Sequence, residues 1–177
     1  MNLEKFRESA FAPTLVILAI CVIITVALAG VYQVTLPIIE QGNIDAANRV
    51  RSQVLPGAES FTKIEGVQLP EGVSEAYKDN AGGGYVFSSA AKGYSGSVTF
   101  LIGINTAGKI TGINMFRHNE TPGLGTKIAA ESHVTKYYGD NDPKAVNAIT
   151  GATLTSNALK NSVLQALEAF NAVKGVK

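Results

Sequence analysis

The residues best suited to chemistry in this sequence are four hydroxyl side chains within residues 150–156. They are Thr150, Thr153, Thr155 and Ser156, and the residues between them are Gly151, Ala152 and Leu154. The segment opens a long helical pattern, and the N-terminus of a helix offers free N–H groups and a partial positive charge that suit a phosphate. Small residues let a ligand approach the backbone closely. The segment therefore predicts either a phosphate-binding helix start or a plain helix cap, with Thr155 or Ser156 as the N-cap.

A second segment of unusual composition is residues 118–125, which read HNETPGLG. Pro122 fixes its own φ angle, and the glycines on either side of Leu124 can adopt conformations closed to other residues. In one interpretation the segment simply connects a strand to a helix. In the other it is a functional loop that holds Leu124 at a rigid tip, because a plain connection would tolerate many polar residues instead.

The sequence offers few side chains for metal binding or thiol chemistry. The sequence has two histidines, His118 and His133, and one cysteine, Cys21. His118 could act as a ligand or a base, but no third ligand accompanies the two histidines. One cysteine cannot build a disulfide framework, a zinc site or an iron–sulfur ligand set. We therefore expect no metal, and redox chemistry would depend on an organic cofactor or a partner protein.

Length and charge narrow the class of protein. The chain has 177 residues, 46% of them hydrophobic, and a net charge of +1. This length fits one ordinary domain with an appendage. No basic run has the density of a nucleic-acid groove, so nucleic acid is not an expected partner.

Residues 13–39 contain no charged side chain. As a helix they would span about 40 Å, against a hydrocarbon core of about 30 Å, which predicts a transmembrane anchor in the lipid bilayer. The alternative is a cleaved signal peptide with Lys5 and Arg7 as its charged start and Ala27-Leu28-Ala29 as its cleavage site. Apolar residues continue beyond Ala29, which favours the anchor. A short N-terminal tail inside the cell would leave the rest of the chain outside.

Beyond the anchor, the pattern is irregular before it becomes clear. Residues 44–54 are compatible with a polar helix that residues 55–57, Leu-Pro-Gly, would end. Residues 58–84 carry no clear period, and the three glycines at 82–84 indicate a turn or a hinge.

An antiparallel hairpin and a final helix are the clearest elements. Residues 98–104 alternate with a period of two, residues 105–108 form a turn, and residues 110–117 return as a strand. Shorter expected elements are strands over residues 85–88 and 146–149 and a helix over residues 127–138. The final helix is predicted from apolar residues at spacings near four, which are Leu159, Val163, Leu167 and Phe170.

The predicted fold class is therefore α+β, with an N-terminal transmembrane helix, a mixed domain with a central antiparallel hairpin, and a long C-terminal helix. We expect a short N-terminal tail at residues 1–12, the transmembrane anchor at residues 13–39, a helical linker at residues 40–57 and one folded domain at residues 58–177.

The two unusual segments, in this order behind an anchor, resemble the FMN-binding domain of the G subunit of Rnf-type ferredoxin:NAD oxidoreductase complexes, which the C subunit of the sodium-pumping NADH:quinone reductase shares. The family's attachment motif is Asp, two variable residues, Ser or Thr, and Gly-Ala-Thr, commonly followed by Thr-Ser. Residues 150–156 match this motif, and Asn147 stands where the family usually has Asp. Residues 120–125, ETPGLG, match the second signature in full. The resemblance covers nearly the whole chain, and the chain's length favours the Rnf-type assignment.

The resemblance implies a covalent cofactor and a set of site residues. A separate flavin transferase would attach FMN from FAD to the hydroxyl of Thr153 through a phosphodiester. Leu124 would pack against the flat isoalloxazine ring, and Thr121 would bond the polar edge of the ring or the phosphate. No residue is expected to be catalytic. The full set of implied cofactor-binding residues is Thr150, Gly151, Ala152, Thr153, Thr155, Ser156, Glu120, Thr121, Gly123, Leu124 and Gly125.

The implied function is electron transfer within a larger complex that couples electron flow to ion translocation. Its partners would be the other membrane and peripheral subunits and the flavin transferase. The FMN-binding domain, residues 58–177, would lie on the extracytoplasmic side of the cell membrane.

Two alternatives from other classes stay open at this point. A pilin-like structural protein also has an N-terminal apolar helix and a small α+β head, although such proteins usually carry a Glu early in the helix and none occurs between Glu8 and Glu40. An anchored binding module that never receives flavin is the other, because Asn147 departs from the attachment motif.

Overall fold

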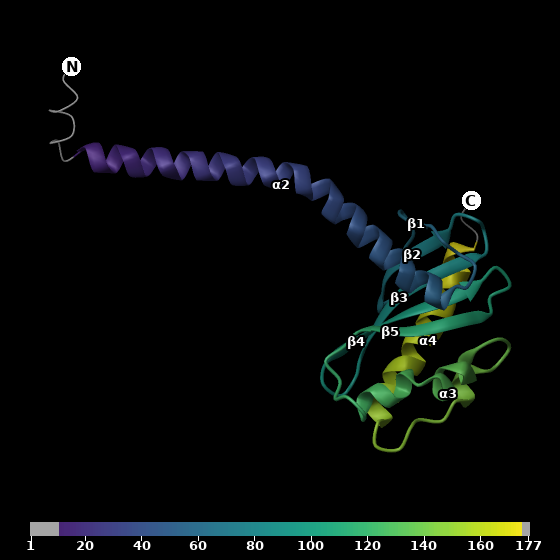
Figure 1. Cartoon of the computed structure of the whole chain (residues 1–177). Helices are drawn as coiled ribbons and strands as arrows, with labels where there is room; N and C mark the ends of the chain where they lie inside the picture. The colour runs from purple at the N-terminus through teal and green to yellow at the C-terminus, as the bar shows by residue number, and fades with distance from the viewer. Residues whose placement is uncertain (1–10, 175–177) are drawn as a thin grey trace. The chain divides into compact units, whose positions relative to one another are not determined.

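The computed structural model describes residues 11–174, and the chain divides into two compact units, residues 1–45 and 46–177 (Figure 1). Helix α2, Phe11–Val54, runs through the first unit and ends in the second. Within it, Leu15–Gln33 is long and apolar enough to cross a membrane, and none of this stretch is buried in the protein. The helix passes Pro37 without a break, so the expected anchor and helical linker form one element. Most of the expected N-terminal tail, with the Lys5 and Arg7 of the signal-peptide alternative, lies outside the described residues.

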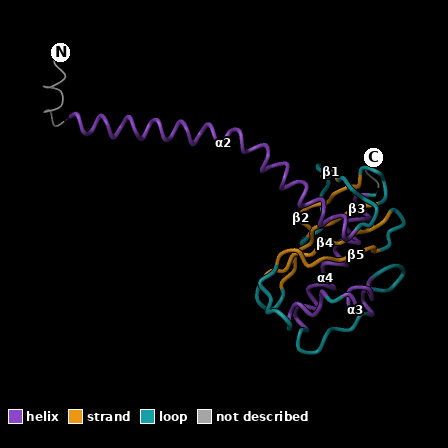
Figure 2. The backbone as a smooth tube through the Cα atoms, in the orientation of Figure 1, coloured by secondary structure: helices purple, strands orange, loops and turns teal. Residues whose placement is uncertain are grey.

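The second unit contains a single antiparallel sheet whose five strands follow one another in chain order (Figure 2). The strands are β1 Phe61–Lys63, β2 Val73–Asp79, β3 Gly84–Lys92, β4 Ser97–Asn105 and β5 Ile110–Arg117. The expected hairpin is confirmed as β4 and β5, which occupy one side of the sheet, and the short strand expected at residues 85–88 is part of β3. The fold is α+β, as the sequence predicts.

Each face of the sheet is covered by a different helix. Helix α4, Thr153–Val173, packs on the face to which Phe87, Phe100 and Ile102 point, and these side chains form the main core. The neighbouring residues Val86 and Leu101 point to the opposite face. They form a smaller core with Val54, the last residue of α2, and with Leu55 and Ala58 just beyond it. Adjacent strand residues face opposite sides, so the two cores share the same strands. Figure 1 shows α4, in yellow, crossing behind the sheet.

The end of α2 approaches the sheet at two glycines. Gly103 on β4 and Gly112 on β5 are register partners, and a methyl group added at either would overlap backbone atoms of Val54. The hydroxyl of Thr111 donates a 2.6 Å hydrogen bond to the carbonyl oxygen of Val54. Such a carbonyl at a helix C-terminus has no partner within its own helix. The glycine pair therefore makes the space in which the helix end docks.

Two expected elements differ in the structure. The segment expected as one helix over residues 127–138 forms three short pieces, η1 Gly125–Ala129, α3 Glu131–Val134 and η2 Thr135–Tyr137. An unbroken helix would place Val134 roughly 120° around its axis from Ile128, whereas the extended backbone at Ala130 resets the phase and lets both side chains be buried.

The prediction of a strand over residues 146–149 is wrong. These residues follow the short helix η3, Pro143–Ala145, and belong to no strand of the sheet. The backbone N–H of Ile149 instead donates to the hydroxyl of Ser156 at 3.0 Å. Their apolar side chains, which produced the strand pattern, pack against the main core from a loop.

His133 on α3 is a buried histidine without a full set of partners. It is 3% exposed, its ring packs edge-to-face on Tyr137, and its Nε2 has no hydrogen-bond partner. Burial, together with the positive charge of Lys136, lowers the pKa of His133 below its ordinary value. The folded protein therefore favours the neutral imidazole.

Substituting Gly103 or Gly112 by Ala should destabilise the second unit by about 1–3 kcal/mol, because the new methyl group overpacks the contact with Val54. Near-UV circular dichroism of the tyrosines during urea unfolding of the detergent-solubilised chain measures the change. Gly42→Ala is the control, since this helical glycine has nothing within 4 Å of an added methyl group. Equal stability of all three variants would contradict the close approach.

The free energy of unfolding should fall as the pH drops below about 6.5, the ordinary histidine value, because the unfolded chain then takes up a proton that folded His133 resists. Above that pH the contribution is fully present. His133→Leu should flatten this part of the pH dependence. Urea unfolding between pH 5 and pH 8 measures it, and a slope retained in His133→Leu would refute the assignment.

Candidate functional site

A cavity of about 360 Å³ lies where three segments of the second unit meet. The segments are the turn between β3 and β4, the loop after β5 and the start of α4. The cavity is lined by Tyr94, Glu120, Thr121, Leu124, Gly125, Gly151, Ala152, Thr153, Leu154 and Thr155. Its size falls in the range of sites that hold a cofactor or a drug-sized ligand. Both segments that the sequence singles out for chemistry thus contribute walls to the same cavity.

The loop after β5 is held by its own backbone. The carbonyl oxygen of Thr121 accepts hydrogen bonds from the N–H groups of Leu124 and Gly125 at 3.2 and 3.1 Å. Gly123 has a φ angle of 74°, a conformation that favours glycine, and its N–H donates to the hydroxyl of Thr126 at 2.9 Å. This turn leaves the side chain of Leu124 44% exposed at the cavity. The rigid tip expected from the sequence is present.

The start of α4 offers free donors. Gly151 has a φ angle of 82°, and the helix begins at Thr153 with Ala152 as its N-cap and no side-chain hydrogen bond to its N-terminus. The N–H groups of the first turn therefore lack intrahelical partners and can bind an anion. The side chain of Thr153 is exposed and lines the cavity. Its hydroxyl lies at the one end of α4 where a negative charge is stabilised.

The prediction that Thr155 or Ser156 caps this helix is wrong. Both side chains are buried inside its first turn. The hydroxyl of Thr155 donates to Oε2 of Glu120 at 3.0 Å, and the hydroxyl of Ser156 accepts from the N–H of Ile149 at 3.0 Å. Two of the four clustered hydroxyls therefore hold the helix start to neighbouring segments, and Thr153 is the exposed residue of the four that lines the cavity.

The expected site residues divide into two groups. Those that line the cavity are Glu120, Thr121, Leu124, Gly125, Gly151, Ala152, Thr153 and Thr155. Those that do not line it are Thr150, which is exposed, Gly123, which shapes the loop, and Ser156, which is buried.

Sequence reasoning missed Tyr94 and Leu154 as lining residues. Tyr94 is 73% exposed at the tip of the turn between β3 and β4, where the N–H of Gly93 donates to the carbonyl oxygen of Gly96 at 2.8 Å. An aromatic residue between two glycines is the signal that could have identified it, because exposed aromatic side chains on tight turns often bind ligands.

The cavity lining suits a flat, largely apolar ligand with an anionic tail. Most of its residues are apolar or carry only hydroxyl groups, and Glu120 is the one carboxylic acid among the lining residues. Both carboxylate oxygens of Glu120 already accept hydrogen bonds from the protein, from the N–H of Ser95 and from Thr155. A phosphate can lie at the start of α4 while a ring system occupies the space between Tyr94, Leu124 and Leu154.

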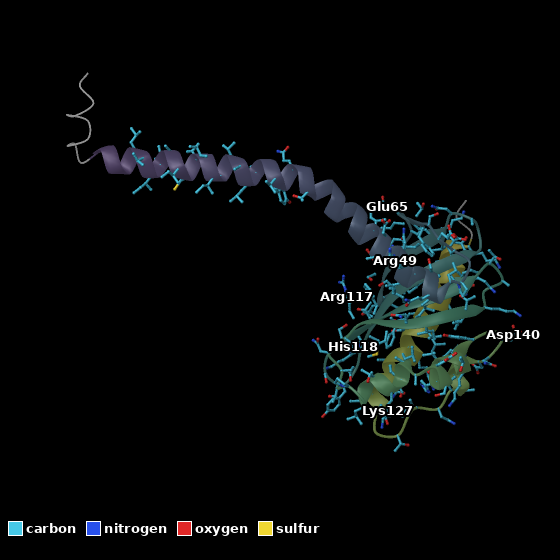
Figure 3. All side chains as sticks on the ribbon, viewed as in Figure 1. Arg49, Glu65, Arg117, His118, Lys127 and Asp140 are labelled. Carbon is cyan, nitrogen blue, oxygen red and sulfur yellow. The ribbon has the colours of Figure 1, made fainter. Side chains whose placement is uncertain are left out.

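The two histidines lie apart from this cavity lining. His118 is exposed just after β5, and Figure 3 shows it next to Arg117, with Lys127 farther along on η1. His133 is buried on α3. Among residues 11–174, no group of three or more histidine, cysteine, aspartate or glutamate side chains could hold a metal ion.

The geometry agrees with the known proteins to which this chain is similar. Residues 93–168 match the family model of the FMN-binding domain. Over the whole of both chains, the protein is 29% identical to the G subunit of the proton-translocating ferredoxin:NAD(+) oxidoreductase complex of Clostridium ljungdahlii. It is also 31% identical to the G subunit of the Na(+)-translocating ferredoxin:NAD(+) oxidoreductase complex of Acetobacterium woodii, over 88% of this chain and 89% of that one.

The matched domain contains the turn with Tyr94, the loop after β5 and the start of α4, so it includes every residue that lines the cavity. The similarity to the two relatives extends beyond it along most of the chain. On this evidence the chain belongs to the family of the G subunits of ion-translocating ferredoxin:NAD(+) oxidoreductase complexes.

Proposed function

We propose that this chain is the electron-transfer subunit of an ion-translocating ferredoxin:NAD(+) oxidoreductase complex and carries FMN covalently on Thr153. The observation that carries the proposal is the exposed hydroxyl of Thr153 at the uncapped start of α4, inside a cavity of the FMN-binding domain. The relatives' names supply the complex, whose other subunits would be the partners of this chain. One relative translocates protons and the other Na(+), so the proposal extends to ion translocation as a class.

FMN fits the residues present. Its phosphate would lie at the first turn of α4, where the helix stabilises a negative charge by about 0.3–1 kcal/mol. Leu124 and Tyr94 would bound the isoalloxazine ring, with Thr121 within the same wall. Gly151 and Ala152 leave the backbone open beside the phosphate, and Thr150, Gly123, Gly125 and Ser156 would act by shaping these walls. When bound, FMN accepts and donates one or two electrons, which the polypeptide itself cannot do.

Attachment would need a separate flavin transferase. The oxygen of the Thr153 hydroxyl attacks the flavin-side phosphorus of FAD, the bond from that phosphorus to AMP breaks, and AMP leaves. The hydroxyl proton must pass to a base, and the carboxylate of Glu120 is occupied by the N–H of Ser95 and the hydroxyl of Thr155. The base would therefore come from the transferase, which would act on a segment that contains Asn147 in place of the family's usual Asp.

The membrane part of the proposal rests on α2. Its stretch Leu15–Gln33 would cross the bilayer, and the second unit would lie on the extracytoplasmic side of the cell membrane. Two hydroxyls in the helix donate to backbone carbonyls one turn earlier, Thr25 to Cys21 and Thr35 to Val31. Such bonds satisfy polar side chains where no water is present. Because the chain belongs to the G-subunit family, the pilin-like alternative no longer applies.

Replacing Thr153 by Ala should abolish covalent flavin, because no other exposed hydroxyl of the motif faces the cavity. In-gel flavin fluorescence after denaturing electrophoresis and the intact mass of the chain measure the attachment. Thr150→Ala and Thr155→Ala should keep the flavin, and Leu124→Ala should keep it while changing its absorbance spectrum. Covalent flavin in Thr153→Ala would refute the attachment site, and a wild-type chain without flavin would favour the binding-module alternative.

The full-length chain should stay in the membrane fraction after carbonate washing, since about 19 apolar residues bind lipid essentially irreversibly. Protease added to cells with a permeabilised outer envelope should digest the second unit while a cytoplasmic marker protein survives. Release of the intact chain by carbonate would contradict the anchor, and survival of the second unit alongside the marker would contradict the orientation.

A further inference from the structure

Glu120 is a buried carboxylate at the point where the three walls of the cavity meet. It is 4% exposed. Its Oε1 accepts a 2.9 Å hydrogen bond from the N–H of Ser95 in the turn between β3 and β4, and its Oε2 accepts a 3.0 Å bond from the hydroxyl of Thr155 in the first turn of α4. The side chain of Glu120 therefore links its own loop to two segments that are distant in sequence.

Two glycines make the space for this carboxylate. A methyl group added at Gly93 would overlap Oε1 of Glu120, and one added at Gly125 would overlap Oε2. Neither glycine has a φ angle in the left-handed region. A side chain added at either position would instead displace Glu120, and at Gly93 it would also meet Val98. Gly93 directly precedes Tyr94, and Gly125 directly follows Leu124. The packing of Glu120 thus bears on the position of Tyr94 and Leu124, two of the three large side chains that line the cavity.

We propose that Glu120 is a positioning residue that fixes the walls of the cofactor cavity, and that its fixed negative charge lowers the reduction potential of the flavin held there. The inference rests on the proposed function, since it takes the ligand of the cavity to be FMN. Glu120 would act on the flavin through its charge and through the segments it holds, because both of its oxygens are occupied by protein donors.

The direction of the electrostatic effect follows from charge alone. Reduction adds negative charge to the flavin, and a carboxylate at the cavity wall opposes that addition. The effect is largest where water is excluded, and Glu120 is nearly fully buried. Between residues 91 and 130 the sequence has no other acidic residue, so no second carboxylate of these strands and loops would mask the loss of this one.

The test compares Glu120→Gln and Glu120→Ala in the full-length, flavin-loaded chain. Gln keeps the size of the side chain but removes the charge; its amide oxygen can still accept from the N–H of Ser95, and its NH2 group can donate to the hydroxyl oxygen of Thr155. Ala removes the charge and both hydrogen bonds. Glu168→Gln is the matched control, since Glu168 is an exposed acid about 20 Å along α4 from Thr153. The measurements are the flavin midpoint potential by spectroscopic redox titration, and hydrogen exchange of the amides of residues 93–96.

We expect Glu120→Gln to keep covalent flavin, and hydrogen exchange at the Ser95 amide should stay as slow as in the wild type. The midpoint potential of the flavin should shift upward. Glu120→Ala should speed exchange at Ser95 by at least about tenfold, the loss of one charge-assisted hydrogen bond. Glu168→Gln should match the wild type in both measurements. A potential in Glu120→Gln equal to that of Glu168→Gln would overturn the electrostatic role, and unchanged exchange in Glu120→Ala would overturn the positioning role.

Failure of the proposed function has a different signature. A wild-type chain without flavin counts against the attachment at Thr153, and the exchange of the Ser95 amide, measured in that flavin-free chain, still decides whether Glu120 positions the cavity walls. If Glu120→Ala does not fold, Glu120→Gln alone decides the electrostatic role. Gly125→Ala then decides the positioning role by the same exchange measurement, because the added methyl group crowds the carboxylate while its charge is kept.

Discussion

A buried carboxylate must receive its hydrogen bonds from the protein, because leaving them unmade costs several kcal/mol. This requirement organises the site end of the domain. Glu120 can be buried only if the turn at Ser95 and the helix start at Thr155 both reach it, and only if Gly93 and Gly125 leave room. The three segments that line the cavity are therefore held together through one side chain. Loops that carry a site are usually its most mobile part, and here they are tied to each other and to α4.

The rest of the domain acts as a scaffold for that end. The sheet is covered on one face by α4 and on the other by the end of α2, so β3 and β4 are buried from both sides. Close approach at Gly103 and Gly112 fixes the end of α2 over β4 and β5, the strands that connect the turn with Tyr94 to the loop with Glu120. A rigid element supporting loops with exposed apolar side chains is the arrangement that holds a cofactor in one geometry.

The parts of the fold that follow a regular period could be predicted from the sequence. In β4 the apolar residues Val98, Phe100, Ile102 and Ile104 recur with a period of two, and α4 repeats its apolar residues every turn. Strand β2 was not predicted, because a register shift between Val73 and Glu75 breaks its alternation. Its buried residues, Val73, Ala76 and Asp79, are three apart. The loop after β5 and the motif at Thr153 were recognisable from their glycines and hydroxyls. The roles of Thr155 and Ser156 could not be recognised from the sequence. Their partners, Glu120 and Ile149, are brought to them only by tertiary structure.

The order of the strands has a consequence for how the domain can form. Each strand pairs with the one synthesised just before it, so the sheet has low contact order and can grow as the chain emerges from N-terminus to C-terminus. The face that carries Phe87, Phe100 and Ile102 nevertheless stays uncovered until α4, the last described element, arrives. Closure of the core and formation of the helix start are thus a single late event. Thr153 reaches its helical position only when α4 packs on the sheet.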